Sequence, residues 1–301
     1  MNIEQITTGQ SLTGIEPAAV VTVITAIPIG DSSGAWSIFI DRFVHVMNVC
    51  GNDWNGSEPH MASAMAHPLP DDSAQCFFTD PPYYYSMQYA DLSDFFYVWL
   101  KRSLAGLHPN LLGLALTGKE DEIIVQSPGH EFATKGKNNA FYESRMTIAM
   151  AEGRRVLAPA GIGAVVFANT TTSGWEAMLQ ALVEAGWVIT ASWPIDTEMS
   201  TRVLAQNRSV LGSSIHLICR PRENPDGSLC HNDIGDWRDV LRVLPERIHE
   251  WLPRLADEGV VGADAIFACL GPALEIFSRY SRVEKASGEV VTLREYLEEV
   301  W

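Results

Sequence analysis

The sequence predicts an α/β fold in which a short, mainly parallel sheet is followed by a helical region. Three observations support this prediction. Apolar segments with strand and helix periods alternate between residues 75 and 220. The first of those strands stops abruptly at Asp80-Pro81-Pro82-Tyr83, and residues 235–301 carry helix-type periodicity interrupted by prolines.

Each element follows from local signals. In chain order we expect a helix over 35–50, a buried strand over 75–79, helices over 91–105 and 141–157, a strand over 162–168, a helix over 174–185, and strands over 187–193 and 213–220. Gly186 stands where a C-terminal glycine belongs. The order implies parallel strands capped by an antiparallel one.

The remaining segments are assigned from composition. Residues 106–139 form a long polar stretch, which we interpret as a mobile loop. Pro159-Ala160-Gly161 is expected to end the helix before it, and Pro245, Pro253 and Pro272 to break the helical tail. The chain thus divides into a segment over 1–60 with one helix, an α/β part over 61–222 and a helical region over 223–301.

Composition limits the partners and the location. The net charge is −16, but it is uneven: residues 80–222 hold 13 acidic and 12 basic residues, while the flanking segments are strongly acidic. No strong basic patch is visible, which counts against a tight grip on DNA by this chain alone. No apolar run is long enough to span a bilayer, no leader is evident, and five scattered cysteines suggest a cytoplasmic protein without a metal site.

The turn after the first strand carries the chemistry. The carboxylate of Asp80 and the carbonyl of Pro81 can each accept an N–H from a planar exocyclic amine, which favours a more pyramidal nitrogen that attacks an electrophilic methyl group. Pro82 stiffens the loop, and Tyr83 offers a ring on which a base can stack. Four residues of these types also occur in ordinary turns. The prediction of a catalytic turn therefore depends on the strand that directly precedes it.

The match to a known family extends well beyond this turn. Residues 80–99, which include YADLSDFFYVW over 89–99, resemble the DUF1156-type adenine-specific DNA methylases. Further matching pieces are FANTTTSGWEA over 167–177, WPIDTE over 193–198, SSIHLICRP over 213–221 and GPALEIFSRY over 271–280. The resemblance covers roughly residues 35–300. The fold that it implies is the second half of a class I (Rossmann-like) methyltransferase sheet.

The resemblance implies S-adenosyl-L-methionine (SAM) as methyl donor and N6 of a flipped adenine in DNA as acceptor. It gives Asp80, Pro81, Pro82 and Tyr83 the catalytic positions and adds Tyr84 as a further aromatic residue of the block. A restriction-modification or phage-defence setting also follows from it.

Other substrate and cofactor contacts are weaker predictions. Tyr85 and Tyr89 could line the flipped base, although core packing explains them equally well. Asn169 follows a strand at a position that often lines a site, and a local turn is the alternative. Ser63 is a candidate contact of the SAM adenine, against the simpler interpretation of a surface loop.

The sequence departs from the family where the cofactor should bind. Family members carry a glycine-rich SAM loop upstream of the Asp-Pro-Pro-Tyr turn, and no such loop precedes Asp80. We therefore expect the carboxyl-terminal portion of a split or truncated enzyme, with a separate chain supplying the SAM-binding half. The alternatives are a methyltransferase acting on RNA or on protein amides, and an inactive remnant or subunit.

Overall fold

The computed structural model describes residues 11–13, 20–22, 36–49, 60–85, 87–126, 136–169, 171–195, 214–224, 228, 230, 233–260 and 263–300. The chain forms two compact units, residues 1–61 and residues 62–301. In the first unit, β1 (Ser11–Thr13) pairs antiparallel with β2 (Val20–Thr22), and α1 (Trp36–Val49) confirms the helix expected over 35–50.

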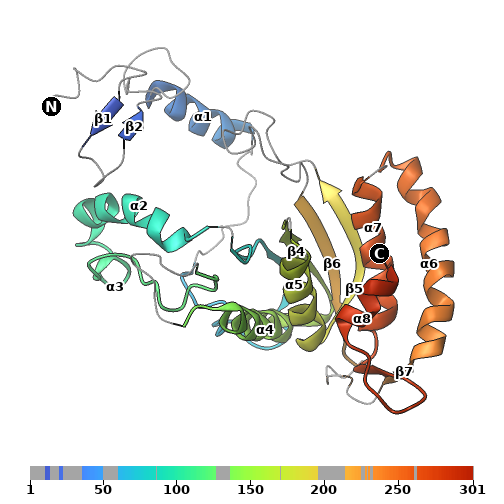
Figure 1. The fold of residues 1–301 in the computed structure, drawn as a ribbon. Helices are drawn as coiled ribbons and strands as arrows, with labels where there is room; N and C mark the ends of the chain where they lie inside the picture. The colour runs from blue at the N-terminus through green and yellow to red at the C-terminus, as the bar shows by residue number, and fades with distance from the viewer. Residues whose placement is uncertain are drawn as a thin grey trace. The chain divides into compact units, whose positions relative to one another are not determined.

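The second unit is built on a mixed four-stranded sheet (Figure 1). Its strands are β3 (Ala74–Thr79), β4 (Leu157–Phe167), β5 (Trp187–Ile195) and β6 (Ser214–Pro221), in the spatial order β3-β4-β6-β5. The pair β3 and β4 is parallel, and β6 runs antiparallel to both of its neighbours. The α/β class is confirmed, and the antiparallel strand lies inside the sheet rather than capping its edge.

Two crossover helices cover one face of this sheet. The chain passes from β3 to β4 through α4 (Asn139–Val156) and from β4 to β5 through α5 (Thr172–Glu184). The side chains of Asn138 and Thr171 accept hydrogen bonds from the amides of Phe141 and Gly174, which caps both helices. Gly186, with φ of +86°, ends α5 in the left-handed conformation that its position predicts.

Trp187 holds these layers together. Its buried ring stacks on Phe77 of β3 with ring centres 5.7 Å apart, and its indole N–H donates to the Met150 carbonyl of α4 at 2.9 Å. The ring occupies the space above Gly163 of β4, where an added Cβ would lie 2.6 Å from it. One side chain thus contacts two further strands and a helix, and a glycine is needed beneath it.

The two edges of the sheet differ. On β5, α7 (Ala263–Ser278) lies against the strand: the Ile189 amide donates to Ser278 Oγ at 3.0 Å, and the Gly271 amide donates to Ser192 Oγ at 2.7 Å. At the other edge, β3 has a partner on one side only among the residues described. The strand was expected to be buried, yet Phe78 is 64% exposed, because it lies on the face of β3 opposite to Phe77 and α4.

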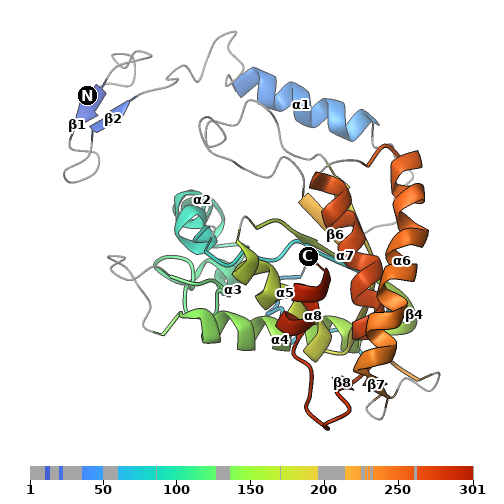
Figure 2. The ribbon, with the colours of Figure 1, turned by 45° about the vertical axis from the view of Figure 1, so that its right-hand side comes forward.

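Proline does not break the C-terminal helices as expected. Helix α6 (Trp237–Asp257) continues through Pro245 and Pro253, and α7 continues through Pro272. Helix α6 lies along α7 on the side away from the sheet in both views (Figures 1 and 2), and Arg247 of α6 forms an ion pair with Glu275 of α7 at 2.5 Å. The tertiary packing therefore outweighs the local cost of each proline.

The remaining elements complete this unit. They are α2 (Tyr89–Leu104), α3 (Pro109–Leu112), the parallel pair β7 (Ile234–Asp236) and β8 (Arg282–Glu284), and α8 (Leu293–Val300). The interpretation of residues 106–139 as a mobile polar loop is wrong for the part that the structure describes, because that part contains α3 and the buried residues Ile123, Ile124 and Val125; residues 127–135 lie outside the described residues. Helix α4 ends at Val156, before Pro159-Ala160-Gly161 as expected, but these three residues belong to β4, which begins earlier than predicted. Among the residues described, no helix combines the length and apolar character needed to cross a bilayer.

The contact between α7 and β5 yields a stability prediction. A Cβ at position 271 would lie 2.2 Å from backbone atoms of Ala191 and Ser192, so Gly271→Ala must push the helix off the strand. We expect a loss of about 1–3 kcal/mol in the free energy of unfolding, measured by urea denaturation. Gly118→Ala, where nothing lies within 4 Å, is the matched control; equal stability of the two variants would contradict this packing.

Candidate functional site

The Asp-Pro-Pro-Tyr turn lies directly at the carboxyl end of β3. Asp80 is exposed, and the Tyr83 hydroxyl donates to its carboxylate at 2.6 Å. This bond orients the carboxylate while leaving its other oxygen for a further donor. Ligand sites of open α/β sheets form at the carboxyl ends of strands, so an exposed, oriented carboxylate here is well placed to meet a substrate.

The turn is fixed from below by a buried tyrosine. Tyr142 of α4, which is fully buried, donates its hydroxyl to the Pro82 carbonyl at 2.8 Å. The Tyr84 amide donates to the same carbonyl at 3.2 Å, and Tyr84 adopts a left-handed backbone with φ of +52°. The two proline rings, this hydrogen bond and the sharp bend together leave the turn little freedom. Sequence reasoning missed Tyr142, since nothing in its helix marks it as part of the turn.

Tyr83 is half-buried against a row of aromatic rings. Its ring meets Phe167 edge-on with centres 5.3 Å apart, and Phe167 meets Trp175 in the same way at 5.0 Å. The Trp175 indole N–H donates to the Asn169 carbonyl at 2.9 Å. This row of rings connects the carboxyl ends of β3 and β4. These strands are adjacent and parallel, and Asp80 and Asn169 each follow one of them. Pro81 itself is buried beneath the turn.

Tyr84, expected to contact substrate, is instead a core residue. It is 2% exposed and meets Tyr142 edge-on at 4.9 Å, because its left-handed backbone turns the side chain inward. Burial, followed by the nearby carboxylate of Glu143, raises the pKa of Tyr84 to about 12. Burial likewise raises the pKa of Tyr142. A tyrosine hydroxyl is protonated at neutral pH in any case, and the raised pKa values keep both groups hydrogen-bond donors to more alkaline pH.

The other predicted contacts are dispersed. Tyr85 is exposed and donates to Asn139 Oδ1 at 2.6 Å, and Tyr89 is exposed at the start of α2. Asn169 Oδ1 accepts from the amide and the hydroxyl of Thr171, both at 2.8 Å, which is the local turn considered as its alternative. Ser63 forms an exposed tight turn in which its hydroxyl accepts from the Met65 amide at 3.2 Å.

Helix α2 is fastened to the body through its polar side. Asp94 accepts from Lys119 Nζ at 2.6 Å and from the Thr117 hydroxyl at 2.6 Å, and Lys119 also pairs with Asp91 at 3.3 Å. Burial alone would raise the pKa of Asp94, but these hydrogen bonds outweigh it and leave the pKa below its ordinary value. The two acids in the first turns of this helix thus pair with a lysine of the following loop.

The loop that carries Thr117 and Lys119 is held in place by further hydrogen bonds. The carboxylate of Glu122 accepts from the Ala90 amide in the first turn of α2 at 2.9 Å. Lys137, 4% exposed, donates to the carbonyls of Lys119 and Glu122, the latter at 2.6 Å. Burial lowers the pKa of Lys137. The ammonium group of Lys137 is therefore used in the structure of this loop itself.

The apolar side of α2 faces away from the other described residues of its own unit, 62–301. None of the helix's residues is buried. Besides Tyr89 at its start, the large apolar side chains that are exposed along it are Leu92, Phe95, Phe96, Trp99 and Leu100. We call these five residues the α2 stripe. An amphipathic helix ordinarily turns such a stripe to the core, and here its polar side is turned inward instead.

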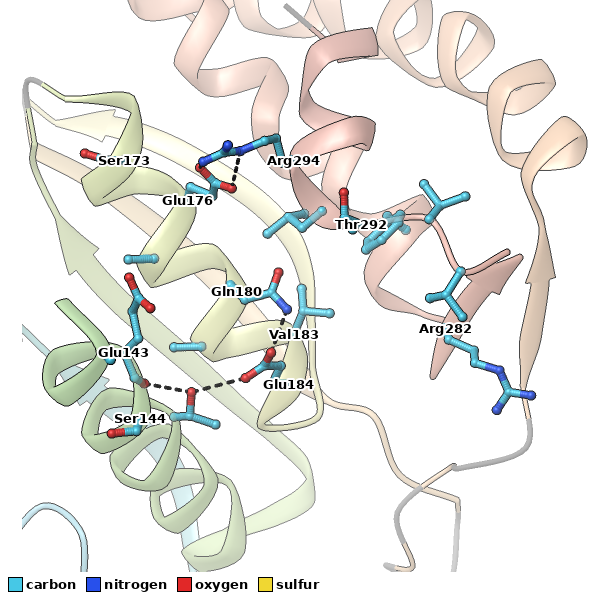
Figure 3. A pocket seen from close by; sticks show the side chains of 18 of the residues that line it. Glu143, Ser144, Ser173, Glu176, Gln180, Val183, Glu184, Arg282, Thr292 and Arg294 are labelled. Atoms are coloured by element: carbon cyan, nitrogen blue, oxygen red, sulfur yellow. Dashed lines mark hydrogen bonds and ion pairs between the residues drawn. The ribbon is translucent and has the colours of Figure 1, made fainter. Parts of the chain in front are cut away.

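A groove elsewhere in this unit does not coincide with the turn. It encloses about 1150 Å³ between α4, α5 and the segment over 281–294 (Figure 3). An ion pair between Glu176 and Arg294 bridges the groove, with 2.8 Å between Arg294 Nε and Glu176 Oε1. Tyr84 contributes to its wall, whereas Asp80 and Tyr83 do not. Among the residues that the structure describes, no group of three or more His, Cys, Asp or Glu side chains is placed to bind a metal.

Comparison with known proteins adds one family match. Residues 2–35 match a domain of unknown function (DUF8742). This segment lies outside the unit that carries the turn. No curated protein matches the chain.

The hydrogen bond beneath the turn predicts the effect of Tyr142→Phe. Loss of the hydroxyl leaves the Pro82 carbonyl with one donor fewer in a buried setting, and we expect a loss of about 1–2 kcal/mol in the free energy of unfolding. Tyr85→Phe removes an exposed hydrogen bond from the same turn and should change stability by less than about 0.5 kcal/mol. Chemical denaturation of both variants provides the measurement, and equal losses would contradict a special role for Tyr142.

The ion pair of α2 predicts a pH dependence. Because the pKa of Asp94 is lowered in the folded state, the pair is fully stabilising above the ordinary Asp pKa of about 4 and is lost as pH falls through the folded value. At neutral pH, Asp94→Asn should speed hydrogen exchange of the α2 amides about tenfold or more, since hydrogen bonds to charged groups contribute about 1.5–3 kcal/mol.

The matched control is Asp239→Asn, which breaks an exposed pair with Arg242 in α6. Exposed pairs contribute little, so amide exchange in α6 should stay within about twofold of wild type. Unchanged exchange of α2 in Asp94→Asn would show that other contacts hold this helix.

Proposed function

We propose that this chain is the catalytic half of a SAM-dependent methyltransferase that acts on N6 of adenine in DNA. The observation that carries the proposal is the exposed carboxylate of Asp80, oriented by Tyr83 at the carboxyl end of β3, in a turn fixed from below by Tyr142. The family resemblance over residues 80–99 gives this turn its chemistry.

The sheet is consistent with the proposal. The second half of a class I methyltransferase sheet contains parallel strands joined by helices together with one antiparallel strand. Here β3 and β4 are parallel, β4 and β5 share a direction, and β6 is the antiparallel strand between them. The order of elements along the chain fits as well, with the Asp-Pro-Pro-Tyr turn following the first of these strands.

The residues of the turn divide the work of holding an amine. The Asp80 carboxylate accepts one N–H of the exocyclic amine. The Pro81 carbonyl is the acceptor proposed for the other, which requires the turn to admit the amine to a residue that is buried in this structure. Both acceptors favour a more pyramidal nitrogen, whose lone pair is no longer delocalised into the ring. Because the amine itself is the nucleophile, no covalent intermediate with the protein is needed. The rigidity supplied by Tyr142 limits the reorganisation needed to reach an in-line geometry.

The residues present do not fit SAM by themselves. Residues 1–79 contain no glycine-rich loop of the family's type, and Ser63, the candidate for the cofactor adenine, sits in an exposed local turn. We therefore assign the acceptor side of the reaction to the described residues and assign them no contact with the methyl donor. DNA binding needs additional cations as well, since residues 80–222 are nearly neutral.

Replacement of Asp80 tests the proposal. The measurement is transfer of a radioactive methyl group from SAM to adenine in duplex DNA, by the full chain with the cofactor-binding half of an intact family methylase. Asp80→Ala should lower the rate by about 10²–10³-fold or more, because a preorganised acceptor at the reacting nitrogen is lost. Stability should be unchanged, since Asp80 is exposed; Asp239→Ala is the control with wild-type activity.

Methylation by Asp80→Ala at the wild-type rate would contradict the mechanism. Competition among duplex DNA, RNA and a glutamine-containing peptide in the same assay identifies the acceptor. Preference for RNA or for the peptide would replace adenine in DNA as the substrate while keeping the role of the turn.

A further inference from the structure

The turn at Asp80 exposes fewer acceptors than the proposed chemistry needs. An exocyclic amine has two N–H groups, and both need an acceptor if the nitrogen is to be held in a pyramidal form. Asp80 is exposed and supplies one acceptor, whereas Pro81 is buried. The Pro82 carbonyl already accepts from the Tyr142 hydroxyl at 2.8 Å and from the Tyr84 amide at 3.2 Å, which uses both of its lone pairs.

The Tyr83 hydroxyl is the polar group that meets the Asp80 carboxylate. Its oxygen lies 2.6 Å from Asp80 Oδ1, in an exposed position. A hydroxyl has one proton and two lone pairs, and the proton of Tyr83 is donated to Asp80. Toward an amine, this oxygen can therefore act only as an acceptor. The bond to a carboxylate also makes the oxygen a stronger acceptor, because consecutive hydrogen bonds polarise one another.

The position of this oxygen is fixed from two sides. The ring of Tyr83 meets Phe167 edge-on with centres 5.3 Å apart, and Phe167 is supported in the same way by Trp175 at 5.0 Å. The turn that carries both Tyr83 and Asp80 is held by the hydroxyl of Tyr142. Two oxygens joined by one hydrogen bond thus form a preorganised pair of acceptors, which needs little rearrangement during the reaction.

We propose that the Tyr83 hydroxyl oxygen is the second acceptor of the substrate amine, in place of the Pro81 carbonyl. One N–H is then held by Asp80 and the other by Tyr83, and the turn does not have to open. This inference rests on the proposed function and gives Tyr83 a catalytic role through its oxygen. An amine held at the hydroxyl lies at the edge of the ring, so the base does not stack on the ring face.

The first test measures the binding of small probes to the isolated full chain. The probes are deoxyadenosine and purine deoxyriboside, which lacks the amine, titrated against the chain with isotope-labelled tyrosine rings and followed by NMR. Wild type should bind deoxyadenosine about tenfold or more tightly, since two hydrogen bonds depend on the amine. Tyr83→Phe should lower this preference about threefold or more, the share expected of an uncharged acceptor.

A pair of acceptors also predicts a preference for primary amines. N6-methyldeoxyadenosine keeps one N–H and can satisfy only one of the two oxygens. Wild type should therefore bind it about threefold or more weakly than deoxyadenosine. This difference should disappear in Tyr83→Phe, in which Asp80 is the remaining acceptor for either probe.

The second test uses the methyl-transfer assay applied to Asp80→Ala. Tyr83→Phe should lower kcat about tenfold or more and change KM by less than about threefold, because an acceptor matters most when the nitrogen becomes positively charged. A ring that serves only for stacking predicts the opposite, since phenylalanine keeps the ring. Tyr97→Phe is the matched control: it removes an exposed hydroxyl that donates to the Leu114 carbonyl, and binding and kcat should stay within about twofold of wild type.

Three results would overturn the inference. They are a wild-type chain that does not prefer deoxyadenosine over purine deoxyriboside, a preference that Tyr83→Phe leaves unchanged, and wild-type methylation by Tyr83→Phe. Failure of the proposed function gives a different pattern. An amine preference that depends on Tyr83 without methylation keeps the acceptor pair and removes the activity. Methylation that is lost in Asp80→Ala but kept in Tyr83→Phe retains the activity and removes the acceptor role of Tyr83.

Discussion

The position of the candidate site depends on Trp187. Its ring lies over Gly163, stacks on Phe77 and donates to the carbonyl of Met150, so three strands and α4 share one side chain. The contact with Phe77 fixes β3 against α4, and β3 in turn determines where its last residue, and therefore Asp80, emerges. A smaller residue at 187 would leave a cavity beneath the edge strand, and a larger one at 163 would displace the ring.

The turn at Asp80 is held in place by residues that are distant from it in the sequence. Tyr142 approaches the Pro82 carbonyl from α4, Phe167 supports Tyr83 from the end of β4, and Trp175 continues the row from α5. The carboxylate at the top is the exposed member of an otherwise enclosed group. This division between a rigid base and an accessible acceptor is what an enzyme needs to orient a weak nucleophile without letting the acceptor collapse into the core.

The sequence predicted the parts of this unit whose signals are local. The strand before Asp80, helices α4 and α5, and the glycine that ends α5 follow from periodicity and capping residues. Features that depend on the surroundings were missed. Pro245, Pro253 and Pro272 remain inside helices because the packing of α6 on α7 holds those helices together. The inward turn of Tyr84 depends on a left-handed backbone at a residue type that rarely adopts it, and no sequence pattern announces it.

The cover that α7 places on β5 has a consequence for assembly. A sheet with two open edges can accept strands at both and grow into a fibre, as heterologous contacts do when nothing closes them. Here the Ser192, Gly271 and Ser278 contacts terminate the sheet on one side. Among the residues described, a further strand can therefore be added at the β3 edge alone, and this prevents open-ended polymerisation through both edges of the sheet.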